Sequence, residues 1–197
     1  DCDPGHDDAM AILWALASPN LEIKAVTTVA GNQTLEKVSN NAIRVLTKAK
    51  RYNIPVALGA KAPLIRKLVI GGELVHGDSG LEGPELPPNG FSVSNLSALK
   101  LFEKILEESK EKITFVGIGP LTNIAQLLIT RPDLKNKIEE IYIMGGGTIG
   151  NWTPAAEYNI FADPEAAKVV FNSSLPIIMA GLDVTQKAYI TREENEI

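Results

Sequence analysis

Four aspartates fall within the first eight residues of the chain: Asp1, Asp3, Asp7 and Asp8. Two carboxylates about 4 Å apart repel each other by roughly 4 kcal/mol at an effective dielectric of 20. A fold that brings three or four of them together therefore needs a cation, a shared proton, or both. Because these side chains offer only hard oxygen ligands, the cation would be calcium or magnesium rather than zinc. The alternative interpretation is that the four acids are helix caps and solvated loop residues.

These acids span the end of a predicted strand and the start of a predicted helix. Side chains alternate along a strand, so Asp1 and Asp3 share one face, where Asp1 could also simply accept hydrogen bonds from loop amides. A Pro-Gly turn follows, and Asp7 or Asp8 stands where a helix N-cap needs an oxygen acceptor. Asp3 is the best candidate for a general base. A carboxylate beside a cation can take a proton from water whose acidity that cation raises.

Apolar runs and amphipathic stretches alternate along the rest of the chain. Strands are predicted at 23–29, 54–58, 113–118, 138–144 and 175–180. Helices are predicted at 8–17, 35–49, 96–108, 121–130 and 164–171. This alternation predicts βαβ units in an α/β fold: an open, mostly parallel sheet covered by helices on both faces, in a single domain over 1–197. Residues 62–94, rich in Gly, Pro and polar residues, form a long loop of the kind that is usually functional or a lid.

The chemistry-bearing segments follow the predicted strands. In open α/β sheets, ligands bind beyond the carboxyl ends of the strands. The acidic segment, Gly31-Asn32, Ile118-Gly119 and residues 145–151 each come directly after a strand. We therefore expect them to gather at one edge of the sheet.

Composition limits the classes of function. The 197 residues are 45% hydrophobic and 22% charged, which is ordinary for a globular domain. The net charge of -5 argues against a nucleic-acid or anionic-membrane partner. The single cysteine, Cys2, excludes an internal disulfide and fits a reducing, cytoplasmic location. No apolar run reaches the roughly 20 residues of a membrane span.

The acidic segment resembles the Asp-x-Asp-x-Gly-x-Asp-Asp signature of the inosine-uridine-preferring nucleoside hydrolases. Other segments are similar to later parts of that family's sequence, in the same order and with similar spacing. These are residues 27–32, 117–123, 144–147 and 156–167. The resemblance implies the Rossmann-like nucleoside hydrolase fold. It also implies calcium-dependent hydrolysis of the N-glycosidic bond of ribonucleosides to ribose and free nucleobase.

The resemblance also assigns roles to individual residues. Asp3, Asp8 and the main-chain carbonyl of Ile118 would be Ca²⁺ ligands, with Asp3 also the general base. An apolar side chain at Ile118 is no objection, because only its carbonyl is used. The small-molecule ribonucleoside would be bound by seven further residues: Asp7, Asn32, His76, Met144, Asn151, Glu157 and Asn159.

Several of these residues have plainer interpretations. Asn32 could be a turn residue in the left-handed conformation. Met144 could be a core methionine, and the polar residues after it could be ordinary loop residues. Of the two histidines, His76 is expected near the nucleobase, whereas His6 is expected to fill the loop. Asp163 most simply caps the following helix.

Two other functions stay open. One is a non-catalytic nucleoside-binding protein, and the other is a magnesium-dependent phosphatase of the haloacid-dehalogenase type, whose Asp-x-Asp motif also ends a first strand. The residues do not decide between purine and pyrimidine. The chain looks like a fragment, with the start of a strand missing before Asp1 and a helix beginning near Thr191 that is not completed. By resemblance, a further third of the family's length would follow, and the protein would be a homodimer or homotetramer.

Overall fold

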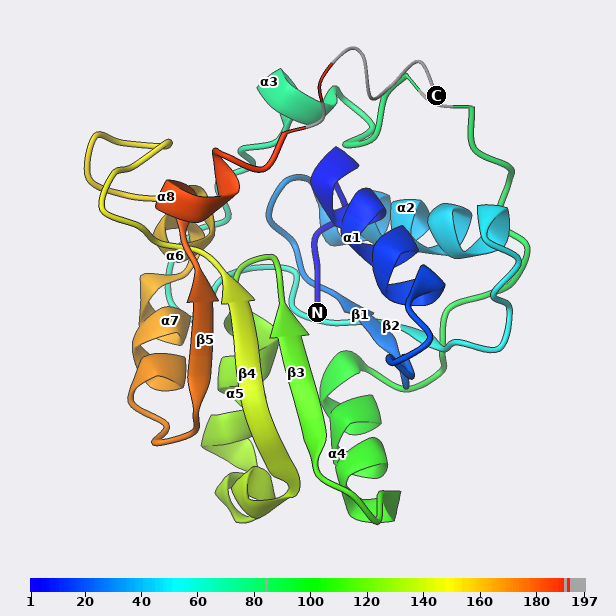
Figure 1. Ribbon diagram of the computed structural model, residues 1–197, viewed down its shortest axis with the longest axis vertical. Helices are drawn as coiled ribbons and strands as arrows, with labels where there is room; N and C mark the ends of the chain where they lie inside the picture. The colour runs from blue at the N-terminus through cyan, green and yellow to red at the C-terminus, as the bar shows by residue number, and fades with distance from the viewer. Residues whose placement is uncertain (84, 190, 192–197) are drawn as a thin grey trace.

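The computed structural model describes residues 1–83, 85–189 and 191. Its strands are β1 (Val26–Thr28), β2 (Val56–Leu58), β3 (Ile113–Gly117), β4 (Ile138–Met144) and β5 (Ile177–Ala180). Its longer helices are α1 (His6–Ala17), α2 (Leu35–Lys48), α4 (Ala98–Glu108), α5 (Thr122–Thr130) and α7 (Pro164–Phe171). Short helical segments are α3 (Glu73–His76), η1 (Pro132–Lys137), α6 (Tyr158–Ala162) and α8 (Leu182–Thr185). Strands and helices alternate as the sequence predicts (Figure 1).

All strand pairs are parallel. β1 pairs with β2, and β3, β4 and β5 form a second sheet with β4 in the centre. This arrangement confirms the predicted α/β class with a parallel sheet. It follows from the helical segments that connect successive strands, since parallel neighbours need a crossover.

Residues 1–3 join the two sheets. The Cys2 N–H donates to the Thr27 carbonyl (3.0 Å), and the Val29 N–H donates to the Cys2 carbonyl (3.0 Å). On the other side the Ile118 N–H donates to the Asp1 carbonyl (2.9 Å). The segment therefore lies between β1 and β3, where Figure 1 places the N-terminus. From this segment the chain continues through β1 and β2 on one side, and then crosses back to form β3 on the other side. The acidic segment thus follows the strand at the topological switch point, where open α/β sheets bind ligands.

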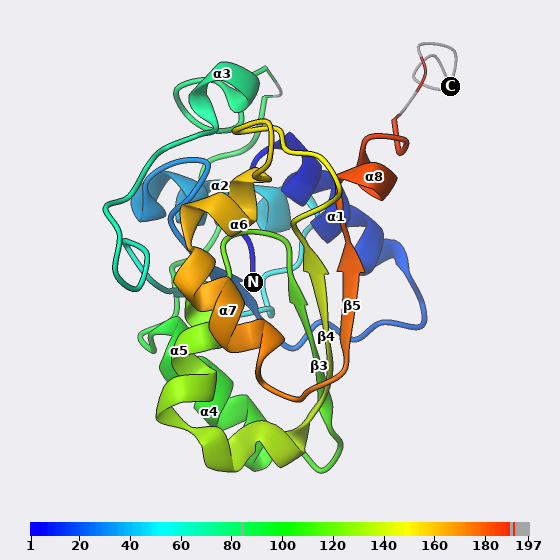
Figure 2. The same ribbon diagram turned by 90° about the vertical axis from the view of Figure 1, so that its left-hand side faces the viewer.

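Helices α4, α5 and α7 all lie on one face of β3–β5 (Figure 2). Their apolar residues enclose a core that includes Leu106, Ile124, Leu127 and Ile141, each 0% exposed. Helix α2 packs against β1 and β2 over a second core that includes Leu46 and Val56. Burial of these side chains supplies most of the free energy that holds the strand ends in place.

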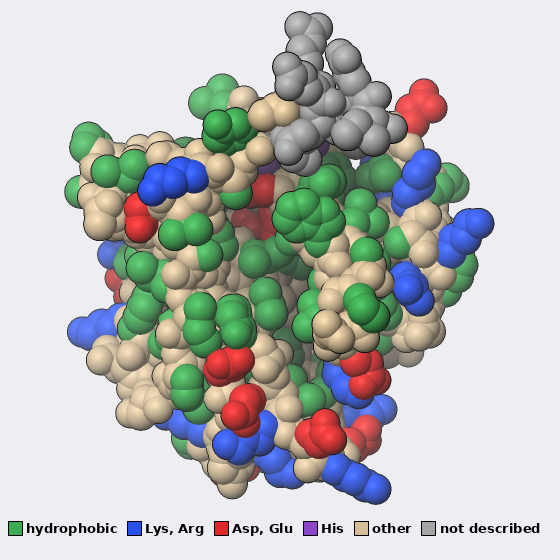
Figure 3. All heavy atoms as spheres, in the orientation of Figure 1, with side chains coloured by type: hydrophobic (Ala, Val, Ile, Leu, Met, Phe, Trp, Pro, Cys, Tyr) green, Lys and Arg blue, Asp and Glu red, His purple; other side chains and the backbone are tan. Residues whose placement is uncertain are grey.

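The opposite face of β3–β5 carries an exposed apolar row. Val116, Tyr142 and Ile178 are neighbours across the three strands and are 50%, 41% and 40% exposed. Figure 3 shows hydrophobic side chains gathered over these strands. The sequence predicted helices on both faces of the sheet. Within the described part of the chain, helices cover only one face of β3–β5.

The structure refines several sequence predictions. The bounds predicted for β4 and α7 are those observed, and Asp163 caps α7 through the Ala166 N–H (3.0 Å), as predicted. The predicted cap of α1 was wrong: Gly5 is the N-cap, and neither Asp7 nor Asp8. The helix predicted to begin near Thr191 falls mostly outside the described residues. No described helix has the length and apolar character that crossing a membrane requires.

Candidate active site

Asp3 and Asp8 form the buried centre of the candidate site. They are 0% and 3% exposed, and one oxygen of each, Oδ1, is buried without a hydrogen-bond partner. Burial, followed by the nearby charge of Asp8, raises the pKa of Asp3 well above its ordinary value. Burial, followed by the charge of Asp7, raises the pKa of Asp8 to about 7. Two buried carboxylates with unsatisfied oxygens are costly unless a cation or protons compensate them.

Asn32 fixes the second oxygen of Asp3. Its main-chain N–H donates to Asp3 Oδ2 (2.7 Å), and its side-chain amide donates to the Asp3 main-chain carbonyl (3.0 Å). Asn32 does not take the left-handed conformation, because the described non-glycine residues with positive φ are Lys50 and Ser174. Asn32 lies in the bend after β1, but without the left-handed conformation that the turn interpretation allowed. Its main-chain N–H orients the Asp3 carboxylate.

Two glycines make room for the Asp3 carboxylate. A Cβ on Gly31 would overlap Asp3 Oδ2, and one on Gly119 would lie 2.5 Å from Asp3 Oδ1. Any larger residue at either position would displace this carboxylate. The sequence places both glycines directly after strands, but their contact with Asp3 depends on how those strands pair.

Asp8 sits in the first turn of α1. Its Oδ2 accepts the Gly5 N–H (3.3 Å), so it closes a capping box from the third helical position. The positive end of the helix dipole also favours a carboxylate there. The other oxygen, Oδ1, is left for a ligand.

These residues fit a hard cation. The charge of such an ion favours the ionised form of both carboxylates and gives the two orphaned oxygens a partner. Among residues 1–83, 85–189 and 191, no group of three or more His, Cys, Asp or Glu side chains is arranged to hold a metal ion. Within the described part of the chain, the further ligands of a calcium ion would therefore be main-chain carbonyls, with water completing the coordination.

Ile118 presents such a carbonyl at the end of β3. In this structure it accepts the side-chain amide of Asn159 (3.0 Å), which also donates to the Met144 carbonyl (3.1 Å). The Met144 sulfur lies 3.3 Å from the same amide nitrogen. The structure thus brings Ile118, Met144 and Asn159 together, next to Gly119 and the Asp3 carboxylate.

Glu157 and Asn151 shape the loop that holds Asn159. Glu157 is buried, and its two oxygens accept the main-chain N–H groups of Asn159 (2.9 Å), Ile160 (3.0 Å) and Gly146 (2.9 Å). It is therefore the N-cap of α6. Asn151 Oδ1 accepts the Tyr158 N–H (2.8 Å) at the same turn. A carboxylate has about four acceptor positions, so a sugar hydroxyl can still donate to Glu157.

Asp7 and His76 form a second pair beside the acidic centre. His76 Nε2 lies 3.6 Å from Asp7 Oδ1, although Asp7 is largely exposed and the imidazole is buried. The ring lies against Gly5, where a Cβ would come within 2.5 Å of Nε2. His76, at the end of α3, therefore packs against the turn that precedes Asp7 and Asp8.

Sequence reasoning missed the role of Asn123. Its amide donates to Asp1 Oδ1 (2.8 Å) and to the Thr28 carbonyl (3.0 Å), while its Oδ1 accepts the Ala60 N–H (2.8 Å). Asp1 Oδ1 also accepts the Thr27 hydroxyl (2.7 Å). Asp1 thus holds strand ends together rather than facing a ligand, which is the plainer of its two interpretations.

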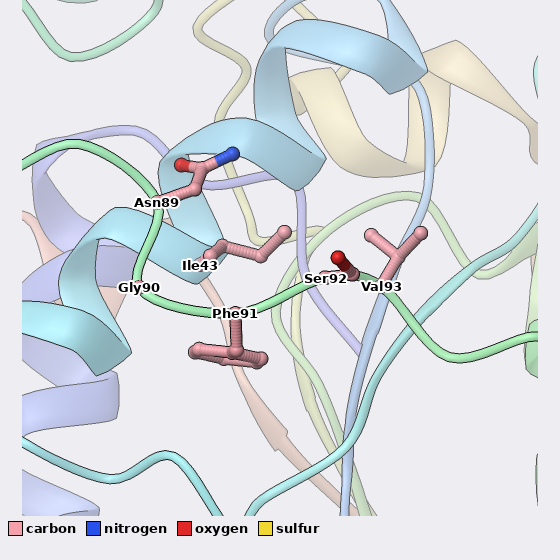
Figure 4. A pocket seen from close by; sticks show the side chains of 6 residues that line it. All are labelled: Ile43, Asn89, Gly90, Phe91, Ser92 and Val93. Carbon is pink, nitrogen blue, oxygen red and sulfur yellow. The ribbon is translucent and has the colours of Figure 1, made fainter.

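The surface is hollowed near this site. Figure 3 shows acidic side chains recessed at the upper centre of the molecule. A separate pocket beside α2 (Figure 4) is lined by Ile43, Asn89, Gly90, Phe91, Ser92 and Val93. None of these six lining residues is an acid or a histidine, and the polar side chains among them are Asn89 and Ser92.

Buried acidic residues at the switch point of a parallel sheet are typical of α/β proteins whose ligand site lies beyond the strand ends. The chain belongs to the inosine-uridine preferring nucleoside hydrolase family, whose family model matches residues 1–197. This finding agrees with the family predicted from the acidic segment.

Similar proteins span a greater length. The chain is 56% identical over 197 residues to the pyrimidine-specific ribonucleoside hydrolase RihA of Escherichia coli O127:H6, and covers 63% of that protein. Among solved structures, it matches a purine-preferring ribonucleoside hydrolase of Gardnerella vaginalis with a TM-score of 0.94 at 32% identity. That match covers 100% of this chain and 64% of the other. A plant nucleoside hydrolase matches with a TM-score of 0.89 at 36% identity, over 100% of this chain and 63% of the other.

Proposed function

We propose that this protein hydrolyses the N-glycosidic bond of ribonucleosides to ribose and a free nucleobase, with calcium as its metal. The observation that carries the proposal is the pair of buried, unpartnered oxygens on Asp3 and Asp8 at the switch point of the sheet. Family membership supports the reaction class. It favours hydrolysis over the phosphatase alternative.

The metal would be held by Asp3, Asp8 and the Ile118 carbonyl. When bound, calcium supplies positive charge that acidifies water and attracts ribose hydroxyls. Asp3 acts as the general base and takes the proton from the attacking water as that water adds to the anomeric carbon. Asn32 holds the Asp3 carboxylate in one orientation, so the base is already aimed when substrate arrives.

The remaining polar residues bind the sugar and the base. Asp7 accepts a ribose hydroxyl, while Asn159, Asn151 and Glu157 line the other side of the ribose. The acidic surroundings stabilise the positive charge that develops on the sugar in the transition state. His76, beside Asp7, donates its Nε2 proton as a hydrogen bond to the departing nucleobase. Direct displacement by water inverts the anomeric centre, by analogy with inverting glycosidases.

The preferred nucleobase is a pyrimidine. This part of the proposal is supported by the relative at 56% identity, which is named pyrimidine-specific, whereas the purine-preferring structure is only 32% identical. Uridine and cytidine are therefore expected to be better substrates than inosine. A higher kcat/KM for inosine than for uridine would overturn this preference.

The decisive experiment measures free base released from uridine with calcium and with a chelator. Turnover that requires calcium supports the proposal. Saturable uridine binding without release of base would identify a nucleoside-binding protein instead, and release of phosphate from a phosphate ester would identify a phosphatase. Calorimetric titration with calcium alone adds a readout independent of activity. Asp8→Asn should weaken calcium binding strongly. Asp133→Asn should not, because Asp133 is an exposed residue of η1 that pairs with Arg131.

A further inference from the structure

His6 contacts both ends of the loop that carries His76. Its ring Nδ1 lies 2.9 Å from His76 Nδ1, and its ring Nε2 lies 2.7 Å from the Glu82 carbonyl oxygen. The loop between these two points is closed by the Glu82 N–H, which donates to the His76 carbonyl (3.0 Å). The two imidazole centroids are 5.2 Å apart. His6 is therefore more than the loop-filling residue that its place in the sequence predicts.

The contacts of His6 fall on one nitrogen of the His76 ring. A carbonyl only accepts, so His6 Nε2 is the donor to Glu82, and the ring Nδ1 of His6 is the atom that faces His76. The main-chain nitrogen of His6 lies 3.3 Å from the same His76 Nδ1. The other ring nitrogen, His76 Nε2, lies 3.6 Å from Asp7 Oδ1. Both contacts from His6 therefore hold the Nδ1 side of the His76 ring and leave Nε2 toward Asp7.

Resting on the proposed function, we infer that His6 is a positioning residue: it orients the His76 ring so that Nε2 faces Asp7 and the departing nucleobase. Without the His6 contacts, His76 is free to rotate about its χ angles. Only one of those orientations points Nε2 at the leaving group. A donor displaced by about 1 Å can lose about 10²-fold in rate.

The two contacts of His6 can be separated by substitution. In His6→Asn, the side-chain amide reaches the place of the ring Nδ1 and can hydrogen-bond to His76 Nδ1 through either its oxygen or its nitrogen. In His6→Gln, the longer amide reaches the place of Nε2 and can donate to Glu82. His6→Phe keeps a ring of similar shape and makes neither hydrogen bond. If His6 acts through His76, the asparagine variant retains most of the activity and the glutamine variant does not.

The experiment uses the full chain with calcium and two substrates. Uridine needs a donor at its leaving base, whereas p-nitrophenyl β-D-ribofuranoside expels a phenolate that is stable without one. We expect kcat for uridine to fall about 10 to 100-fold in His6→Phe and His6→Gln, with KM little changed. His6→Asn should restore most of kcat, and the p-nitrophenyl substrate should be affected far less in every variant. Crystal structures should show His76 Nε2 turned away from Asp7 in His6→Phe and retained beside it in His6→Asn.

Three results would overturn the inference. These are full uridine turnover by His6→Phe, equal losses in His6→Asn and His6→Gln, or equal losses on both substrates, since the last indicates a general structural defect. A wild-type protein that hydrolyses neither substrate would instead count against the proposed function, and would remove the basis of this inference with it.

Discussion

The side-chain amide of Asn159 donates a hydrogen bond to the main-chain carbonyl of Ile118 at 3.0 Å. This bond ties α6 to the end of β3, and the second bond, to Met144, ties the same side chain to the end of β4. A carbonyl oxygen has two lone pairs, so Ile118 can accept Asn159 and still bind a cation. Asn159 thus orients the proposed metal ligand from the side on which the sugar would lie.

Replacing Asp3 should abolish most of the activity. Asp3→Asn keeps the shape of the side chain but removes the negative charge and the base, so kcat should fall by about 10³-fold or more. The measurement is release of free base from uridine at saturating calcium, with circular dichroism to show that the variant is folded. Asp133→Asn serves as the matched control on the surface. A folded Asp3→Asn protein with near-wild-type turnover would contradict the base assignment.

Ribonucleosides should be strongly preferred to their 2-deoxy analogues. Asp7 and the calcium ion are proposed to hold the ribose 2-hydroxyl, and a substrate without it leaves these groups unpaired. Sites built to bind a hydroxyl reject the analogue that lacks it by about 10⁴-fold or more. The ratio of kcat/KM for uridine and deoxyuridine measures this directly. Asp7→Ala should reduce that ratio, and equal rates on the two substrates in the wild type would refute the assignment.

The bounds of some elements were predictable because they depend on the local sequence pattern. β4 is a seven-residue segment with three isoleucines, and α7 begins with the Asp163-Pro164 cap, so both carry their own signals. The short helices α3 and α6 have four and five residues. Neither is long enough to show an apolar period, and both are fixed by contacts with distant segments.

The position of the candidate site was predictable from the sequence, but the contacts made by its residues were not. The Asp3 to Asp8 segment is contiguous, and its place after a strand locates the site. Asn123, by contrast, bonds to Asp1 across 122 positions of the chain, and nothing near either residue signals that contact. Glu157 likewise has both oxygens on main-chain N–H groups, which only the folded loop reveals. The sugar-binding roles of Asn151, Glu157 and Asn159 stay predictions.

The pH dependence of stability should contain a contribution from His76. Burial, assisted by the nearby His6 ring, lowers the pKa of His76 below its ordinary 6.5, despite the opposing charge of Asp7. Below pH 6.5 the unfolded chain therefore binds more protons than the folded one. This contribution is fully present above that pH and is lost as the pH falls through it toward the folded-state pKa.

Urea unfolding at pH 7.5 and pH 5.5, roughly one unit either side of the ordinary value, tests this at constant excess calcium. His76→Gln should lose less stability than the wild type over that interval, and an identical loss in both proteins would show that His76 does not contribute.

Removing the Asn123 side chain should destabilise the joint between the two sheets. The side chain is 2% exposed and makes hydrogen bonds to Asp1, Thr28 and Ala60. Asn123→Ala removes all three hydrogen bonds and leaves the Ala60 N–H without its partner, although Asp1 keeps the Thr27 hydroxyl and the Thr28 carbonyl keeps the Gly59 N–H. It should lower the free energy of unfolding by about 2 to 4 kcal/mol. Asn172→Ala is the matched control, because the Asn172 amide bonds only to the Lys168 carbonyl on an exposed helix end, and it should cost about 0.5 kcal/mol or less. Urea unfolding of both variants in calcium provides the comparison.

Because Asn123 supports the segment that carries Asp3, the same variant should also bind calcium less tightly. Equal stability losses in the two variants would mean that these three hydrogen bonds do not hold the sheets together.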